Sequence, residues 1–180
     1  EGITFVLTTL YEHAGWLAGL LFGGTYSAIV ITGIHHSFHA IEAGLLGNPS
    51  IGVNFLLPIW AMANVAQGGA CLAVYFKTRD MKIKAITVPA AMSCLLGITE
   101  AAIFGVNLRY IKPFLAGLFG GACGGAYVVA AKVGMTAVGL TGIPGMAIVQ
   151  PMSLIHYVIG LVIAFGAAFA ASYLLKYKVE

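Results

Sequence analysis

Long apolar stretches separated by short polar breaks run along the chain and predict transmembrane helices. The longest cover residues 53–76, 113–133 and 152–173. At a rise of 1.5 Å per residue, each is long enough to cross about 30 Å of hydrocarbon. The segment 3–22 has a similar length, but Glu12 and His13 in its middle make an amphipathic helix at the membrane interface an alternative.

Glycine and proline divide the remaining apolar stretches. We expect Gly23-Gly24 to end the first segment and a second helix to follow at 25–46, closed by the turn Gly47-Asn48-Pro49. Residues 134–150 are rich in glycine and predict a loop or another re-entry. Arg109 and Lys112 mark a polar break before 113–133.

Two segments have the pattern of broken or re-entrant helices. Residues 53–76 contain Pro58 and several polar positions, and 85–96 is only about a dozen residues long and contains Pro89. Such interruptions are tolerated at membrane depth only where they line a cavity. We therefore expect an all-α membrane bundle of roughly five spans with one or two re-entrant hairpins, and a binding site near the interruptions.

Composition supports the membrane assignment. The chain is 60% hydrophobic and only 8% charged, whereas soluble domains carry about 25% charged residues. Its 24 glycines suit close contact between helices in lipid. A soluble domain is thereby excluded, and the chain is expected to be embedded in a lipid bilayer.

The basic residues indicate an orientation. Four of them form one cluster, at Lys77, Arg79, Lys82 and Lys84, and Lys176 and Lys178 come near the end. Short loops rich in Lys and Arg face the cytoplasm, so residues 77–84 and the C-terminal segment are expected on that side. With so few basic residues, nucleic acid is not expected as a partner.

A histidine-rich segment is the first candidate for chemistry. On a helix, one face would carry Thr32, His35, His36, His39 and Glu42. Ionisable side chains inside an apolar segment usually face a polar cavity, although a helix end near the headgroups is an alternative. A metal on His35 and His39 is a further alternative, but no Cys or Asp completes a ligand set and the H-E-x-x-H pattern is absent.

The second candidate is Glu100, which follows Gly97 and Thr99 between two short apolar runs. A carboxylate there would accept hydrogen bonds from a ligand or carry a proton, unless it pairs with Arg109 or Lys112. The amides of Asn64 and Gln67 would either contact a ligand or join helices.

Carboxylate, imidazole and amide groups in one membrane cavity suit a neutral polyol or sugar. A proton-coupled solute, with Glu100 and His35 as the relay, is the alternative from another functional class. Cys71, Cys94 and Cys123 form no C-x-x-C pair, so neither a zinc ribbon nor a redox pair is expected, and no cofactor is expected.

Two motifs add a family resemblance. The sequence GITEAAIFGV at 97–106 resembles the signature of the membrane (EIIC) subunit in the glucose superfamily of bacterial phosphotransferase-system permeases. TGIHHSFHAIE at 32–42 resembles the paired-histidine segment of that family, in the form typical of sucrose permeases. Ala101 departs from the family pattern, which usually has proline after the glutamate, so a looser turn is expected there.

The resemblance implies a sugar-binding transport domain in the bacterial inner membrane. Glu100 would bond sugar hydroxyls and one or both of His35 and His36 would contact the same sugar, with Thr99, Asn64 and Gln67 as further candidate contacts. The resemblance covers residues 1–180 as the C-terminal part of an EIIC domain. The N-terminal scaffold half, through which the family dimerises, and the cytoplasmic EIIB domain are expected to lie outside it.

No catalytic residue is expected in the chain itself. By the resemblance, a phosphocysteine on EIIB, supplied through EIIA, would phosphorylate the sugar, and none of the three cysteines has the family's phosphorylated motif. The favoured ligand is sucrose.

Overall fold

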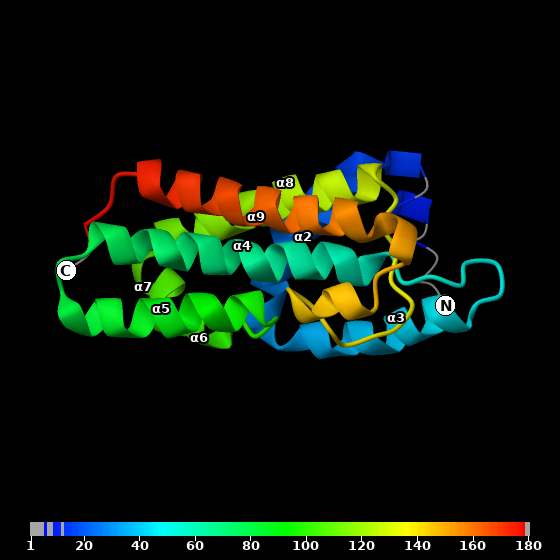
Figure 1. Ribbon diagram of the computed structural model, residues 1–180, viewed down its shortest axis with the longest axis horizontal. Helices are drawn as coiled ribbons and strands as arrows, with labels where there is room; N and C mark the ends of the chain where they lie inside the picture. Colours follow the sequence, from blue (N-terminus) through cyan, green and yellow to red (C-terminus); the bar gives the residue numbers. More distant parts are fainter. Residues whose placement is uncertain (1–5, 7–8, 12, 179–180) are drawn as a thin grey trace.

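The computed structural model describes residues 6, 9–11 and 13–178, and every regular element in that part of the chain is a helix. Four long helices form the body: α2 (Trp16–Thr32), α4 (Leu56–Lys77), α8 (Lys112–Ala130) and α9 (Leu154–Leu174) (Figure 1). The expected all-α membrane fold is confirmed.

The described part of the chain contains fewer spans than the whole chain is expected to have. Three helices of the described part are long and apolar enough to cross a membrane, and a bent pair of helices adds a fourth if it counts as one span. The described residues therefore contain three or four of the roughly five expected spans. The expected number of spans included the segment 3–22, but its first residues and Glu12 lie outside the described residues.

Helix α4 is the centre of the bundle, because α2, α5, α8 and α9 all pack on it. It is buried along almost its whole length, as expected for a helix that is apolar on every face. The predicted interruption of this segment was wrong. Pro58 lies in the first turn, where a missing N–H breaks no helical hydrogen bond, and Gly68 and Gly69 let α5 and α9 approach closely.

The first of two helical hairpins is formed by α2, the short turn η1 (Ile34–Ser37) and α3 (Phe38–Gly47), with a bend of 113° between its arms. The break lies at Gly33, which adopts the left-handed conformation. The predicted break at Gly23-Gly24 was wrong, because both glycines continue α2 and are used for packing.

The second hairpin is formed by α5 (Met81–Leu95) and a return segment of α6 (Glu100–Ala102), η2 (Ile103–Asn107) and α7 (Leu108–Tyr110). Its tip, at residues 96–99, lies where the sequence indicated a break. The two hairpins enter the bundle from opposite ends, and their tips meet near its middle, where α3 and α5 lie end to end beside α4 (Figure 1).

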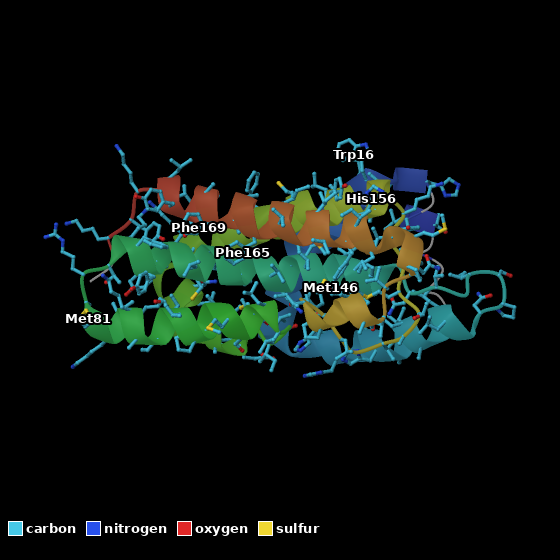
Figure 2. All side chains as sticks on the ribbon, in the orientation of Figure 1. Trp16, Met81, Met146, His156, Phe165 and Phe169 are labelled. Carbon is cyan, nitrogen blue, oxygen red and sulfur yellow. The ribbon has the colours of Figure 1, made fainter. Side chains whose placement is uncertain are left out.

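Glycines bring α2 and α8 into backbone contact. A Cβ atom on Gly19 would overlap the carbonyl oxygen of Gly125, and one on Gly23 would overlap that of Gly121. Membrane helices gain little hydrophobic energy by leaving lipid, so contacts of this kind between small residues hold them together. The outer face of α9, in contrast, presents exposed apolar side chains such as Ile155 and Val162 (Figure 2).

Eight of the nine basic residues lie at one end of the bundle, near Met81 in Figure 2. They are Lys77, Arg79, Lys82, Lys84, Arg109, Lys112, Lys176 and Lys178. Lys77 donates to the carbonyl oxygens of Ser172 and Tyr173 at 3.3 and 3.0 Å, which ties α4 to the end of α9. The cluster 77–84 and the C-terminal segment thus share one face, as the proposed orientation requires.

The opposite end is closed by the loop 131–150. Met135 pairs with Asn54 through two backbone hydrogen bonds of 2.9 and 3.0 Å and also forms a bridge with Val149. The loop includes the short turn η3 (Pro144–Ala147), and η4 (Pro151–Ser153) leads into α9. The prediction of a loop at 134–150 is confirmed, and its inner part reaches the second hairpin.

We expect Gly23→Ala to destabilise the bundle by about 1–3 kcal/mol, because the added methyl group forces α2 and α8 apart. Gly166→Ala is the matched control, since a Cβ there meets nothing within 4 Å, and it should raise stability by about 0.5–1 kcal/mol. Thermal unfolding in detergent measures both. Equal effects of the two substitutions would contradict the close α2–α8 contact.

Candidate functional site

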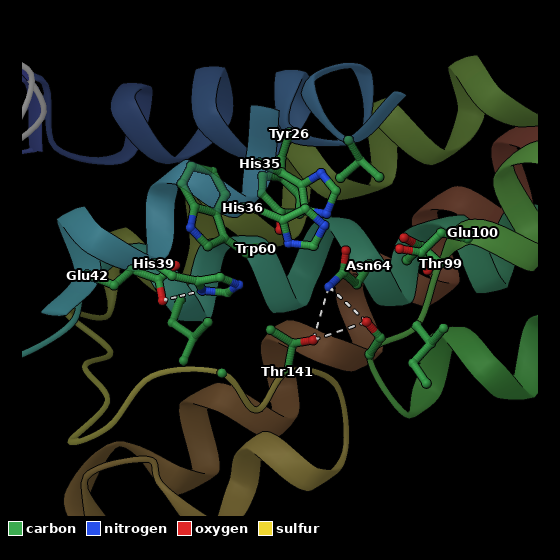
Figure 3. A pocket seen from close by; sticks show the side chains of 15 residues that line it. Tyr26, His35, His36, His39, Glu42, Trp60, Asn64, Thr99, Glu100 and Thr141 are labelled. Atoms are coloured by element: carbon green, nitrogen blue, oxygen red, sulfur yellow. Dashed lines mark hydrogen bonds and ion pairs between the residues drawn. The ribbon is translucent and has the colours of Figure 1, made fainter. Parts of the chain in front are cut away.

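A cavity of about 200 Å³ lies where the two hairpin tips meet (Figure 3). The first hairpin contributes Tyr26, Val30, His35, His36, His39 and Glu42, and α4 contributes Leu57, Trp60 and Asn64. The tip of the second hairpin contributes Gly97, Ile98, Thr99 and Glu100, and the loop contributes Gly139 and Thr141. Segments far apart in sequence thus build one polar site inside an apolar bundle.

The histidines reach the cavity from a helix break rather than from one continuous helix. His35 and His36 lie in η1, with ring centroids 4.0 Å apart, and the ring of His39 follows at 6.1 Å from His36. The bend at Gly33 turns Thr32 away, and its hydroxyl donates to the carbonyl oxygen of Ile29 at 2.6 Å. The predicted single face was therefore wrong for Thr32.

Glu100 lies at the tip of the second hairpin. Gly97 has φ of +91°, which favours glycine, and the turn that it forms brings Thr99 and Glu100 to the cavity. Thr99 is buried, whereas Glu100 is exposed. Arg109 lies in α7 at the opposite end of the return segment, nine helical residues or about 13 Å away, so the alternative of an ion pair with Arg109 has no support here.

Asn64 ties the walls of the cavity together. Its amide donates to the hydroxyl of Thr141 at 3.0 Å and to the carbonyl oxygen of Gly97 at 3.5 Å. Helix α4, the loop and the tip of the second hairpin are therefore joined at one point. Thr141 was missed by sequence reasoning, because only its contact across 77 residues of sequence brings it to the site.

Gln67, a predicted ligand contact, is fully buried and is not among the residues that line the cavity. Its side-chain oxygen accepts from the amide of Asn107 at 2.7 Å, and its amide donates to the carbonyl oxygen of Phe114 at 3.4 Å. It joins α4, η2 and α8, which is the alternative role considered for amides in these segments.

Two residues that line the cavity were not predicted as ligand contacts from the sequence. Trp60 lines the cavity and stacks on Tyr26 with ring centroids 4.4 Å apart. Glu42, noted only as part of the histidine face, is 1% exposed. Its Oε2 lies 3.6 Å from Nδ1 of His39, a contact that is an ion pair only when His39 is protonated.

The arrangement suits an uncharged ligand with many hydroxyl groups. Carboxylates accept hydrogen bonds, amides both donate and accept, and histidine does either according to its tautomer. Within the described part of the chain, no cluster of three or more His, Cys, Asp or Glu side chains is placed to hold a metal ion.

Comparison with known proteins gives one family and a set of named relatives. The family model for the phosphotransferase system EIIC domain matches residues 1–121. The chain is 77% identical over its whole length to the sucrose-specific EIIBC component of Salmonella typhimurium, of which it covers 40%. It is 62% identical to the sucrose-specific EIIBC component of Bacillus subtilis strain 168, over 98% of this chain and 38% of that protein.

A more distant relative is named for another disaccharide. The trehalose-specific EIIBC component of Bacillus subtilis strain 168 is 40% identical over 95% of this chain and 36% of its own length. The chain spans about two fifths of the length of the curated relatives that it matches. No solved structure matches it significantly.

We expect Gly97→Ala to strain the tip of the second hairpin by about 1–3 kcal/mol, because alanine disfavours this φ and its Cβ would overlap the hydroxyl of Thr141. Gly105→Ala is the matched control on the same hairpin, where the nearest atom to a Cβ is 4.0 Å away. Hydrogen exchange of residues 95–101 should accelerate in the first variant only. Unchanged exchange in Gly97→Ala would show that the tip is not held as described.

Proposed function

The chain belongs to the EIIC family of the phosphotransferase system, and we propose that it is the sugar-binding part of a sucrose permease. The observation that carries the proposal is the cavity between the hairpin tips, because it brings Glu100 of one motif and His35 and His36 of the other to the same ligand space. The membership agrees with the resemblance of residues 32–42 and 97–106. Relatives named for sucrose, at up to 77% identity, favour sucrose over trehalose.

The substrate would bind through a few groups with distinct roles. In this proposal, Glu100 accepts hydrogen bonds from neighbouring sugar hydroxyls, a geometry that a carboxylate with two oxygens can satisfy. His35 and His36 contact the same sugar from η1, and Thr99 and Asn64 border it. Gln67 is left out of the site, because its side chain is used between helices.

We propose that the phosphoryl donor is outside this chain. Cys71 and Cys94 are buried and Cys123 is half-buried, so none is exposed for transfer from another protein. The proposal therefore places the phosphocysteine on an EIIB domain, charged through EIIA. It assigns residues 1–180 to the C-terminal part of an EIIC domain, with a dimerising N-terminal half elsewhere in the same permease.

The basic end of the bundle supports an orientation for transport. In the inner membrane, the face with Lys77 and Lys112 would lie toward the cytoplasm, where EIIB is found. The cavity lies midway between the two ends of the bundle. In this proposal, a shift of the domain opens the cavity first to the periplasm and then to the cytoplasm. Sugar would enter from the periplasm and leave inward as the phosphate.

A proton-coupled transporter with Glu100 and His35 as the relay was the alternative from sequence. Membership in the EIIC family does not favour it. The two mechanisms differ in product, because a proton-coupled transporter releases unmodified sugar and depends on the proton gradient.

We expect cells that carry the full-length permease to accumulate sucrose phosphate from labelled sucrose without a proton gradient.

Glu100→Gln should reduce sucrose uptake by about 10- to 100-fold, because hydrogen bonds to a charged acceptor are lost. Asp80→Asn is the matched control. It also removes one negative charge, but at the basic end, where Asp80 accepts a hydrogen bond from the backbone N–H of Lys82.

Asp80→Asn should leave uptake unchanged, since asparagine also caps a helix. Free sucrose as the product, with uptake that collapses when the gradient is removed, would contradict the phosphotransferase mechanism. Normal uptake by Glu100→Gln would contradict the assigned role of the carboxylate while leaving the family intact.

A further inference from the structure

Glu42 is a buried carboxylate in the wall of the cavity with an incomplete set of partners. It is 1% exposed, and its Oε2 atom accepts no hydrogen bond of normal geometry. The ring of His39 approaches this atom only to 3.6 Å, beyond normal hydrogen-bond length. A buried polar atom without a hydrogen bond costs about 1–3 kcal/mol, so Oε2 of Glu42 is suited to accept a hydrogen bond from a ligand hydroxyl.

Two other buried polar atoms of the same wall, the indole nitrogen of Trp60 and Nδ1 of His35, also make no hydrogen bond of normal geometry. The side chains of His39, Asn54 and Trp60 lie close enough to the Glu42 carboxylate to interact with it weakly. Acceptor and donor groups therefore lie together around Glu42, and a hydroxyl can serve both because it donates and accepts.

The position of Glu42 separates it from the hairpin-tip carboxylate. Figure 3 shows Glu42 and His39 on one side of the cavity and Thr99 and Glu100 on the other, with His35, His36 and Asn64 between them. The two carboxylates come from different hairpins, Glu42 from α3 and Glu100 from the second tip. The cavity thus has two polar poles, each built around one carboxylate.

We propose that Glu42 is a second sugar-binding residue, which holds one ring of the disaccharide while Glu100 holds the other. This inference rests on the proposed function and adds a specificity-determining residue to it. A hydroxyl of the ring at the Glu42 pole donates to Oε2, and the exposed ring of His39 moves aside to admit it. A monosaccharide reaches only one pole, so Glu42 accounts for preference for a disaccharide.

The test uses the purified full-length permease and monodeoxy analogues of sucrose, in each of which one ring hydroxyl is replaced by hydrogen. In the wild type, removal of the hydroxyl at Glu42 should weaken binding by about 10- to 100-fold. In Glu42→Gln, the same removal should cost only a few fold, while removal of a hydroxyl on the other ring costs as much as in the wild type. This difference is the coupling between residue and hydroxyl.

Two comparisons separate binding from a structural role. Asp80→Asn, which removes a charge far from the cavity, should reproduce the wild-type losses for every analogue. Equal losses for all analogues in the wild type and in Glu42→Gln would overturn the inference, because a merely structural residue shifts all affinities together. A wild type that binds no sucrose would overturn the proposed function itself.

The wild-type series alone tests the inference if Glu42→Gln does not fold. Two poles require that essential hydroxyls occur on both the glucosyl and the fructosyl ring. Essential hydroxyls confined to one ring would contradict a second pole at Glu42.

Discussion

In a bilayer, a backbone N–H or C=O that leaves a helix finds no water to bond, so a helix can be interrupted only where protein shields the break. This chain interrupts its helices at Gly33 and at Gly97, and residues next to both breaks line one cavity together with residues of α4. The cavity exists because the two breaks meet. Side chains at the breaks, His35 and Glu100 among them, share a space that no single continuous helix would provide.

The rest of the bundle keeps the two breaks together. Helix α4 is buried and straight through the middle, and the glycine contacts of α2 with α8 fix the first hairpin beside it. Asn64 then joins α4 to Gly97 and Thr141. Because Glu42 and Glu100 belong to different hairpins, a shift of one hairpin would change the distance between the two carboxylates.

The sequence predicted the class of fold and singled out many of the polar residues that line the cavity, but it did not predict how they are arranged. Apolar length identified the spans at 113–133 and 152–173, and Gly97 with Glu100 identified the second hairpin, because these signals are local. Gly23-Gly24 was misread as a break, since a glycine pair that packs against a neighbour looks the same in sequence as one that ends a helix. Gln67 and Thr141 depend on partners 40 and 77 residues away, which no local pattern shows.

The central claim is that the space between the two hairpin tips holds the sugar. A structure of the full-length permease with bound sucrose, determined by electron cryomicroscopy, tests it most directly. The account predicts density for one disaccharide between Glu100 and α3, in contact with His35. Density in the separate cavity beside Tyr11, Phe55 and Lys132, with the space between the tips left to water, would contradict it.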